Sequence, residues 1–393
     1  MIYPKFLQPG SQILVISPSD GNSEPLAESR ITMAANKFEK RGDSVLLGKD
    51  IFHSEKSRSA DALKRVEEIH NGISDSNIQL LIASAGGEYA MEILPYLDFS
   101  IVRKNPTWIQ GFSDVTILTY TVTTVCDIAT LYASNFKDFS MEKLHPTLIN
   151  NLEILNGRIV EQSSEKMYQD QYIEYVDGNE GYRLTRPVKW KGNPCHMEGR
   201  LLGGCIDVLS NIVGTPYDHT KEFIEKYQED GILWYLENCE LSEAEFTRVL
   251  WKMRECGWFE HTNGILFGRS TVDETLWEQS PSEIVDEQLG KYHIPCLFDI
   301  DLGHKPPRMT FINGAYGIVD WDGKEVEYEM VNKGFVGFPI EEGTHTVTLE
   351  YQSPWFRAGV FLSGIGLLSA LVIILFDIKK RRYDTSTRQV LTK

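Results

Sequence analysis

The chain has 393 residues, which suggests about two domains, and its 42% hydrophobic and 24% charged residues are typical of a globular protein rather than a disordered one. Its 56 acidic residues exceed its 39 basic residues and leave a formal net charge of −17, which argues against nucleic acid as the main partner because phosphate binding needs a basic face. The six cysteines are scattered without a Cys-x-x-Cys pair, a pattern typical of a reduced, cytosolic chain rather than of a disulfide framework or a zinc site.

Extended apolar segments alternate with helical patterns through the first 150 residues. Strands are expected at 12–16, 44–47, 79–84, 108–110 and 128–132, and helices at 27–40, 60–72, 87–97 and 114–126. This alternation indicates βαβ units around a parallel sheet, so residues 1–150 are predicted to form an α/β domain of the Rossmann or flavodoxin type. Neither a dinucleotide-binding glycine fingerprint nor a P-loop lysine follows the first strand, which disfavours a nicotinamide or nucleoside-triphosphate enzyme.

Ligand sites in such a sheet form beyond the carboxyl ends of the strands, where the loops 85–87 and 111–113 are expected. Ser113 stands between a strand end and a helix start. Free helix N–H groups and the positive end of the helix dipole can face a developing oxyanion there, as a serine nucleophile requires. The same position suits a helix cap by Ser113 or Asp114, so this segment alone leaves both interpretations open.

The periodicity weakens at 151–197, which is predicted to connect to a second domain at 198–330. Strands there are expected at 232–236, 264–267 and 296–300, and a helix at 243–256. Glu237 directly follows the first of these strands, and His304 lies in a turn-rich loop after the last. Each residue alone is typical of a solvated or structural side chain. Together with Ser113 they supply the nucleophile, acid and base of a triad, in the chain order of α/β-hydrolases.

The C-terminal region has the pattern of a membrane segment. Residues 358–376 are uncharged and four basic residues follow at 379–382. At about 1.5 Å per residue this segment spans roughly 28 Å, close to a bilayer core, which predicts a transmembrane helix between a short β segment at 331–357 and a basic tail at 377–393. With this helix, the alternating segment 343–351 resembles the closing segment of large bacterial multi-spanning membrane proteins.

The expected orientation of that helix leaves three alternatives open. The positive-inside rule places the basic tail in the cytoplasm and the preceding residues outside. No secretory signal opens the chain, however. Insertion against the rule, export by another route and fusion to a foreign membrane segment would each reconcile the two observations. We expect a cytoplasmic catalytic domain that is anchored by the C-terminal helix, with its sidedness left open.

Five sequence blocks in order carry a family resemblance. They are Ser84-Ala-Gly-Gly-Glu-Tyr with Leu94-Pro-Tyr-Leu-Asp, Gly111-Phe-Ser-Asp-Val-Thr, Glu198-Gly-Arg-Leu-Leu-Gly-Gly with Gly214-Thr-Pro-Tyr, Trp234-Tyr-Leu-Glu, and Gly303-His-Lys-Pro-Pro. On these blocks, residues 1–330 resemble the LD-carboxypeptidase family of serine peptidases, which includes the microcin C self-immunity peptidases. Phe112 stands where the family more often has tyrosine, a conservative change that should not disturb the turn.

The resemblance implies roles for the candidate residues. Ser113 would be the nucleophile, His304 the base and Glu237 the residue that orients it, while the backbone N–H groups of Gly87 and Asp114 would form the oxyanion hole. The resemblance also implies no metal or other cofactor, an N-terminal parallel-sheet domain, a β-rich α+β C-terminal domain and often a homodimer.

The resemblance leaves two substrate classes open. One is the murein tetrapeptide, whose terminal D-alanine is trimmed in cell-wall recycling. The other is an aminoacyl group joined by an amide to a modified adenylate, whose cleavage detoxifies an antibiotic. A ring in the aromatic connection 167–191 could stack on a nucleobase, or the rings could pack between the domains. The sequence around Trp190 and at 236–258 favours the immunity-like branch of the family. Trp190 is therefore a candidate substrate contact.

Two other function classes compete with a peptidase. A catalytically idle binding protein, tethered to a membrane as a sensor of cell-wall fragments, would share the same scaffold. An ordinary α/β esterase would hydrolyse esters broadly without preferring a free carboxylate. The presence of Ser113, Glu237 and His304 together argues against the idle protein, because such a protein has no need of all three.

Overall fold

The computed structural model describes residues 1–173, 175–323, 329–331 and 335–337. The predicted helix at 358–376, the basic tail and most of the predicted β segment at 331–357 lie outside these residues. Within the part of the chain that is described, no helix is both long and apolar enough to span a bilayer. The structure therefore gives the transmembrane prediction no support.

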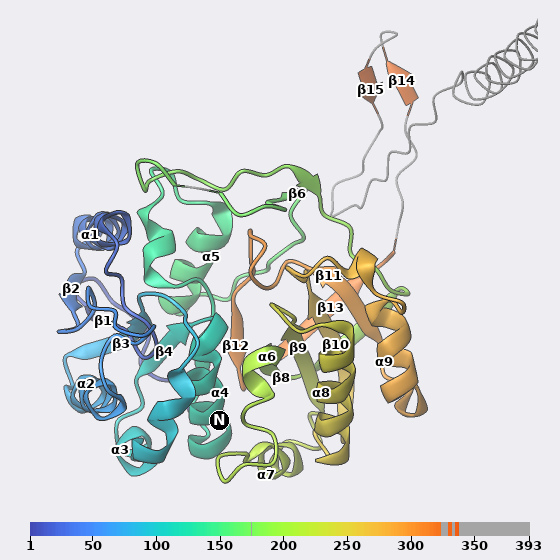
Figure 1. Cartoon of the computed structure of the whole chain (residues 1–393), viewed down its shortest axis with the longest axis horizontal. Helices are drawn as coiled ribbons and strands as arrows, with labels where there is room; N and C mark the ends of the chain where they lie inside the picture. The colour runs from blue at the N-terminus through green and yellow to red at the C-terminus, as the bar shows by residue number, and fades with distance from the viewer. Residues whose placement is uncertain (174, 324–328, 332–334, 338–393) are drawn as a thin grey trace, which may run out of the picture. The chain divides into compact units, whose positions relative to one another are not determined.

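A six-stranded sheet forms the N-terminal half, in the order β12-β5-β4-β3-β1-β2 (Figure 1). Its strands are β1 (Gln12–Ile16), β2 (Ser44–Leu47), β3 (Ile78–Ala83), β4 (Trp108–Gly111), β5 (Thr130–Tyr132) and β12 (Phe311–Asn313). The first five pair in parallel, whereas β12 joins the edge antiparallel to β5. β1 and β3 are apolar and buried almost throughout, as expected of parallel strands covered on both faces. The prediction of a parallel N-terminal sheet is confirmed.

Helices cover both faces of this sheet (Figure 1). They are α1 (Pro25–Lys40), α2 (Ala62–Ser74), α3 (Phe99–Lys104), α4 (Thr116–Cys126) and α5 (Pro146–Leu155), with the 3₁₀ helices η1 (Ala90–Tyr96), η2 (Ser113–Val115) and η3 (Phe136–Ser140). α1 and α5 share one hydrophobic cluster with the sheet, and α2, α3 and α4 share another. In α1, Ile31, Ala34 and Phe38 repeat at helical spacing and are buried. The helix expected at 87–97 is the 3₁₀ helix η1, which contains Pro95.

A five-stranded sheet in the order β11-β10-β9-β8-β13 forms the second half. Its strands are β8 (Cys195–Cys205), β9 (Ile232–Glu237), β10 (Thr262–Gly268), β11 (Cys296–Ile300) and β13 (Tyr316–Trp321); the helices are α6 (Ile206–Leu209), α7 (Thr220–Lys226), α8 (Glu243–Glu255), α9 (Pro281–Leu289), η4 (Glu274–Leu276) and η5 (Gly290–Tyr292). β8 to β11 pair in parallel and β13 pairs antiparallel with β8. The expected α+β arrangement is corrected here: helices separate the successive strands, which therefore return in the same direction.

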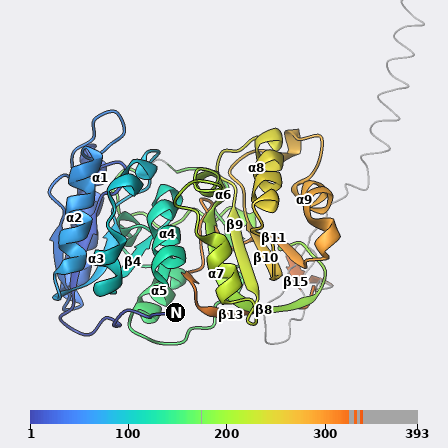
Figure 2. The ribbon, with the colours of Figure 1, turned by 90° about the horizontal axis from the view of Figure 1, so that it is seen from below.

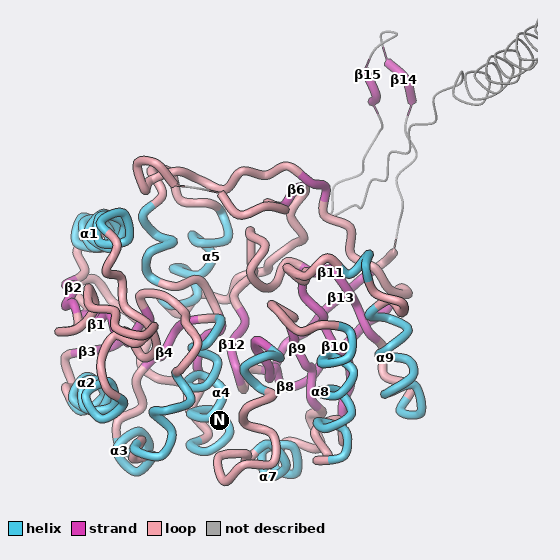
Figure 3. Tube along the Cα trace, viewed as in Figure 1, coloured by secondary structure: helices cyan, strands magenta, loops and turns pink. Residues whose placement is uncertain are grey.

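A long connection rich in loops joins α5 to β8, as Figure 3 shows. Its regular pieces among the described residues are the two-residue strands β6 (Met167–Tyr168) and β7 (Arg186–Pro187), which pair antiparallel. Further along the chain, β14 (Glu329–Val331) and β15 (Phe335–Gly337) form another antiparallel pair.

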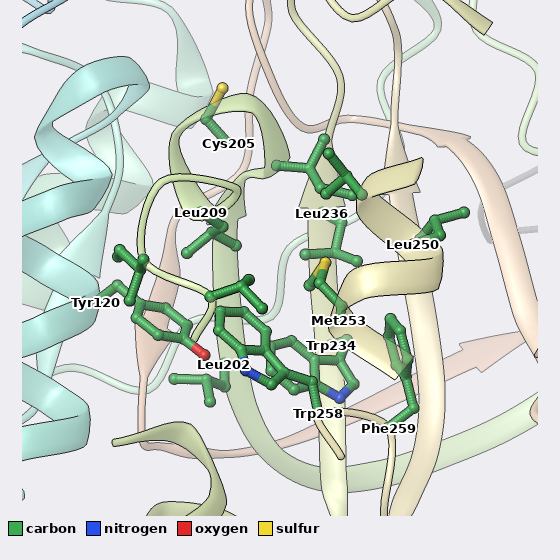
Figure 4. Packing of buried hydrophobic residues seen from close by; sticks show 14 of the residues in the cluster. Tyr120, Leu202, Cys205, Leu209, Trp234, Leu236, Leu250, Met253, Trp258 and Phe259 are labelled. Atoms are coloured by element: carbon green, nitrogen blue, oxygen red, sulfur yellow. The ribbon is translucent and has the colours of Figure 1, made fainter. Parts of the chain in front are cut away.

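The two sheets share a core at α4, which lies beside α6 and α7 (Figure 2). Tyr120 of α4 stacks on Trp258 with 5.4 Å between ring centroids, and Trp258 stacks on Trp234 of β9 at 5.6 Å. All three rings are fully buried (Figure 4). This three-ring stack joins the helix that follows Ser113 to the strand that ends at Glu237.

Candidate active site

Ser113 is the first residue of η2, at the sharp turn that follows β4, and it has a positive φ of 65°. A residue other than glycine rarely holds this conformation, and such strain is concentrated at functional sites. It matches the nucleophile elbow, which exposes a serine hydroxyl at the end of a strand. Phe112 takes the N-cap position of η2, and no side chain caps that helix. The cap interpretation of Ser113 and Asp114 is therefore wrong.

The Asp114 side chain stabilises the turn through two hydrogen bonds. Its Oδ2 accepts a hydrogen bond from the backbone N–H of Ala90 at 2.7 Å and another from the hydroxyl of Ser19. Burial raises the pKa of the Asp114 carboxyl, and these two donors oppose that effect. The side chain thus ties η1 and the loop after β1 to the turn of Ser113.

The loop 84–87 packs directly against Ser113. A Cβ placed on Gly86 would lie 2.8 Å from both Cβ and Oγ of Ser113 and 3.8 Å from the backbone nitrogen of Asp114, so a side chain at 86 would displace the serine. Gly87 has a φ of 150°, and a Cβ there would lie 2.9 Å from the backbone nitrogen of Asp20. The N–H of Asp114 is in the first turn of η2, where helical N–H groups have no intrahelical acceptor. Gly86, next to Gly87, thus lies against Ser113, while the role of the Gly87 and Asp114 N–H groups as oxyanion donors stays a prediction.

Glu237 is the last residue of β9, and its side chain is fully buried. Its Oε2 accepts two hydrogen bonds from His304, one from Nδ1 at 2.9 Å and one from the backbone N–H at 3.1 Å. Its Oε1 accepts a hydrogen bond from the hydroxyl of Tyr132. Burial by itself would raise the pKa of Glu237, but the charge and hydrogen bond of His304, the hydrogen bond from Tyr132 and the charge of Arg308 together leave this pKa lowered.

The pKa of His304 shifts in the opposite direction. Burial by itself would lower the pKa of the imidazole, but the charge and hydrogen bond of Glu237, together with the nearby Cys239, raise the pKa of His304 to about 10. The nearby thiol of Cys239 acts in the same direction as Glu237 on this pKa. The ring also packs on Phe112, with 5.0 Å between centroids, so His304 contacts the turn that carries Ser113. Among the described residues Ser113 Oγ has no hydrogen-bond partner, so its contact with His304 is not made in this structure.

The loop that carries His304 is fixed by Arg308. The Arg308 guanidinium donates to the carbonyl of Gly303 at 2.9 Å and to Asp138 at 2.8 Å, and its central carbon lies 4.0 Å from the centre of the Phe112 ring. Gly303 has a φ of 101°, and a Cβ there would collide with the carboxylate of Glu237. A glycine is thus required beside the acid.

Trp190 supports the same loop from the other side. Its indole N–H donates to Asp301 Oδ2 at 2.9 Å, and its ring lies 5.7 Å from that of Trp321. Arg269 donates to the other oxygen of Asp301 at 3.0 Å and to the carbonyl of Pro307 at 2.8 Å. The predicted contact of Trp190 with substrate stays a prediction.

Sequence reasoning missed Tyr132, Arg308 and Asp207. Asp207 accepts hydrogen bonds from the backbone N–H groups of Cys239 at 2.9 Å and Glu240 at 2.7 Å, which shapes the loop after Glu237. A signal for Tyr132 was available, because it ends the strand that pairs in parallel with β4, the strand that leads to Ser113. The partners of Arg308 and Asp207 are tertiary contacts that no local pattern indicates.

Comparison with protein-family models gives three matches. The LD-carboxypeptidase N-terminal domain matches residues 13–133, and the LD-carboxypeptidase C-terminal domain matches residues 198–318. The third match, to the bacterial membrane protein YfhO, covers residues 318–363, most of which lie beyond the described part of the chain.

Relatives and solved structures agree with the first two matches. A putative carboxypeptidase of Treponema pallidum is 25% identical over 333 residues, which are 82% of this chain and 94% of the relative. The microcin C7 self-immunity protein MccF of Escherichia coli is 23% identical over 312 residues, which are 76% of this chain and 88% of the relative. A solved structure of MccF in complex with aspartyl sulfamoyl adenosine has 21% identity, a TM-score of 0.66, and coverage of 82% of this chain and 96% of that one. This likeness shows a shared fold.

Proposed function

This chain belongs to the LD-carboxypeptidase family and is a serine peptidase-like hydrolase, and on that premise we propose that it cleaves an amide bond in a small peptide or aminoacyl conjugate through Ser113, His304 and Glu237. The observation that carries the proposal is the pair of hydrogen bonds from His304 to buried Glu237, in a loop packed on the strained turn of Ser113. Nucleophile, base and orienting acid are the three parts that acyl transfer by serine needs.

The proposed reaction has two steps. Ser113 Oγ attacks the amide carbonyl carbon while Nε2 of His304 takes the hydroxyl proton, and the N–H groups of Gly87 and Asp114 stabilise the oxyanion. The C–N bond then breaks, and His304 gives its proton to the leaving amine. Water next attacks the acyl-enzyme with His304 again as the base, which releases the acid and restores Ser113. Glu237 orients the imidazole and stabilises its charged form throughout.

We propose that the substrate carries a free carboxylate, and Lys137 supports this. Its backbone N–H donates to the carbonyl of Ser84 at 3.4 Å, next to the loop of the oxyanion hole. Burial lowers the pKa of its ammonium, which has no hydrogen-bond or ion-pair partner among the described residues. The neighbouring Arg30 and Arg308 both pair with Asp138. The charges of Asp138 and Asp20 favour this ammonium without forming an ion pair with it, and an anionic group of a substrate would offset the remaining cost of its burial.

Both substrate classes fit this requirement. A murein tetrapeptide ends in the carboxylate of D-alanine, and the family's description as LD-carboxypeptidases supports this class. An aspartyl sulfamoyl adenosine carries a side-chain carboxylate, and the complex of MccF with that compound supports the aminoacyl-nucleotide class. Stacking of Trp190 on a nucleobase would favour the second class.

We also propose that the uncharged segment 358–376 anchors the hydrolase to a membrane. The match of residues 318–363 to a bacterial membrane protein supports this proposal.

A mass-spectrometric turnover assay tests the hydrolase on the full-length chain. A murein tetrapeptide and an aminoacyl-sulfamoyl adenosine are offered in parallel to wild type and to Ser113→Ala. Release of D-alanine or of the sulfamoyl adenosine by wild type, lost by at least about 10³-fold in the variant, is the expected result and identifies the substrate class. Equal turnover by Ser113→Ala would remove the proposed nucleophile. Binding of murein peptides without turnover would favour the idle binding protein, and broad ester hydrolysis would favour an esterase.

A further inference from the structure

We infer that Tyr132 is a positioning residue of the catalytic site, whose hydroxyl holds the Glu237 carboxylate in the orientation that His304 needs. The inference rests on the proposed triad and adds a fourth residue to it. It starts from the hydrogen bond that the Tyr132 hydroxyl donates to Oε1 of Glu237.

The two oxygens of Glu237 have different donors. Oε2 accepts both hydrogen bonds from His304, and Oε1 accepts the one from Tyr132. The carboxylate side chain is fully buried and Tyr132 is 1% exposed, so water cannot readily replace the hydroxyl. Without Tyr132, Oε1 would be a buried and unpaired carboxylate oxygen, which is a costly state. The carboxylate would then rotate away from His304, or it would interact more strongly with the protonated imidazole, which would then release its proton less readily.

The Tyr132 ring is held in place by its neighbours. Phe112 packs on it edge-on with 6.4 Å between centroids, and Tyr235 packs on it at 5.5 Å. Burial and the nearby charge of Glu237 raise the pKa of the Tyr132 phenol well above its usual value, so it stays a donor at every pH at which the hydrolase would work.

Tyr132 also connects the acid to the nucleophile strand. In the parallel pairing of β4 and β5, Tyr132 lies opposite Gly111, two residues before Ser113. Glu237 belongs to the other sheet. One hydrogen bond therefore fixes the position of Glu237 relative to the strand that leads to Ser113. A tyrosine with a purely structural role would not do this.

A matched pair of substitutions tests the inference. Tyr132→Phe removes the hydroxyl and keeps the ring. Tyr235→Phe does the same to an adjacent, fully buried tyrosine whose hydroxyl donates to Asn313 Oδ1 at 2.6 Å and not to the triad. Both full-length variants are compared with wild type by thermal unfolding, by kcat and KM across pH, and by NMR titration of the His304 imidazole.

Tyr132→Phe is expected to lower kcat by about 10- to 100-fold with KM little changed, the size of one charge-assisted hydrogen bond. It is also expected to move the acidic limb of the pH profile and the His304 titration to higher pH, because the proton is then held more tightly. Tyr235→Phe should leave kcat, the acidic limb of the pH profile and the His304 titration unchanged. Equal kinetics and equal titrations in the two variants would overturn the inference. The His304 titration needs no substrate, so it tests the role of Tyr132 even if no turnover is measured. The proposed function is tested separately, because wild-type turnover by Ser113→Ala would overturn it.

Discussion

Two residues at the site have backbone conformations that residues other than glycine rarely adopt. Ser113 accepts a positive φ of 65° so that its hydroxyl leaves the turn, and Gly303 takes a φ of 101° so that its loop can pass beside Glu237. The strain at Ser113 costs free energy, on the order of 1–3 kcal/mol, which the surrounding contacts must offset. Asp114 provides such contacts through its hydrogen bonds to Ser19 and Ala90.

The pKa shift of His304 gives a pH prediction. The Glu237 charge raises the pKa of His304, so the imidazole stays protonated above its usual range near pH 6.5, and only the neutral form can take the serine proton. We expect kcat/KM to fall as the pH drops through this raised pKa. Glu237→Gln should lower kcat by about 10⁴-fold and move the acidic limb to lower pH, because the charge that raised the pKa is gone. Rates measured from pH 5 to 10 check both effects, and a limb that stays in place in Glu237→Gln would contradict the pairing.

Lys137 gives a prediction about substrate charge. Lys137→Met should lower kcat/KM by about 10- to 100-fold for a substrate with a free carboxylate and leave the rate for its amide analogue unchanged, because the ammonium interacts with the carboxylate alone. Lys143→Met, an exposed lysine shortly after it in the chain, is the control. The measurement is the ratio of kcat/KM for acid and amide in each variant. An unchanged ratio in Lys137→Met would assign the carboxylate to another residue.

At the scale of elements, the position of Ser113 relative to Glu237 depends on how α4 packs against β9. The stack of Tyr120, Trp258 and Trp234 joins these two elements at distances of 5.4 and 5.6 Å. The three rings are fully buried, so they cannot shift without opening a cavity. This packing fixes the position of the proposed nucleophile relative to the proposed acid, although the two residues follow strands of different sheets.

Removing the middle ring tests this packing. Trp258→Ala should lower the free energy of unfolding by about 3–5 kcal/mol, whereas Trp251→Ala, which removes a half-exposed indole from α8, should change it by less than about 1 kcal/mol. Urea unfolding of both variants provides the comparison. Similar losses in the two variants would show that the stack contributes no more than a surface tryptophan.

The elements show which parts of the fold local patterns can predict. Apolar runs between turn signals located β1, β9 and β11 within a residue or two, and the strand-end rule led to Ser113, Glu237 and His304 because catalytic loops gather at that edge. The 3₁₀ character of η1 and the parallel direction of the second sheet were missed. Pairing direction depends on the connections between strands, and the hydrogen bonds of Tyr132 to Glu237 and of Arg308 to Asp138 join residues more than 100 positions apart, so no local periodicity predicts either.

At the scale of the whole molecule, the chain crosses between the two sheets more than once. After β11 of the second sheet it returns to the first as β12, where it pairs with β5, and then enters the second sheet again as β13. Asn313 of β12 also accepts a hydrogen bond from the backbone N–H of Gly203 at 3.1 Å. The range 198–330 therefore supplies a strand to both sheets.

The C-terminal sequence gives a prediction for the full-length chain. We expect it to sediment with membranes and to be released by detergent but not by high salt, since about 19 uncharged residues match a bilayer core. Leu367→Arg places a charge at the middle of that segment, at a cost of about 2.5–3.5 kcal/mol for insertion, and should shift the protein toward the supernatant. Fractionation followed by immunoblotting measures both. A wild-type chain that stays in the supernatant would rule out the anchor.

The return of β12 to the first sheet has a consequence for a chain that is cut. A protease that cleaves the loop between β6 and β7 would divide the polypeptide into one piece with Ser113 and another with Glu237 and His304. The second piece still contributes β12 to the sheet of the first piece, as well as the rings that pack on α4. The nicked protein should therefore migrate as a single particle in gel filtration, and the two pieces, produced separately, are suited to fragment complementation.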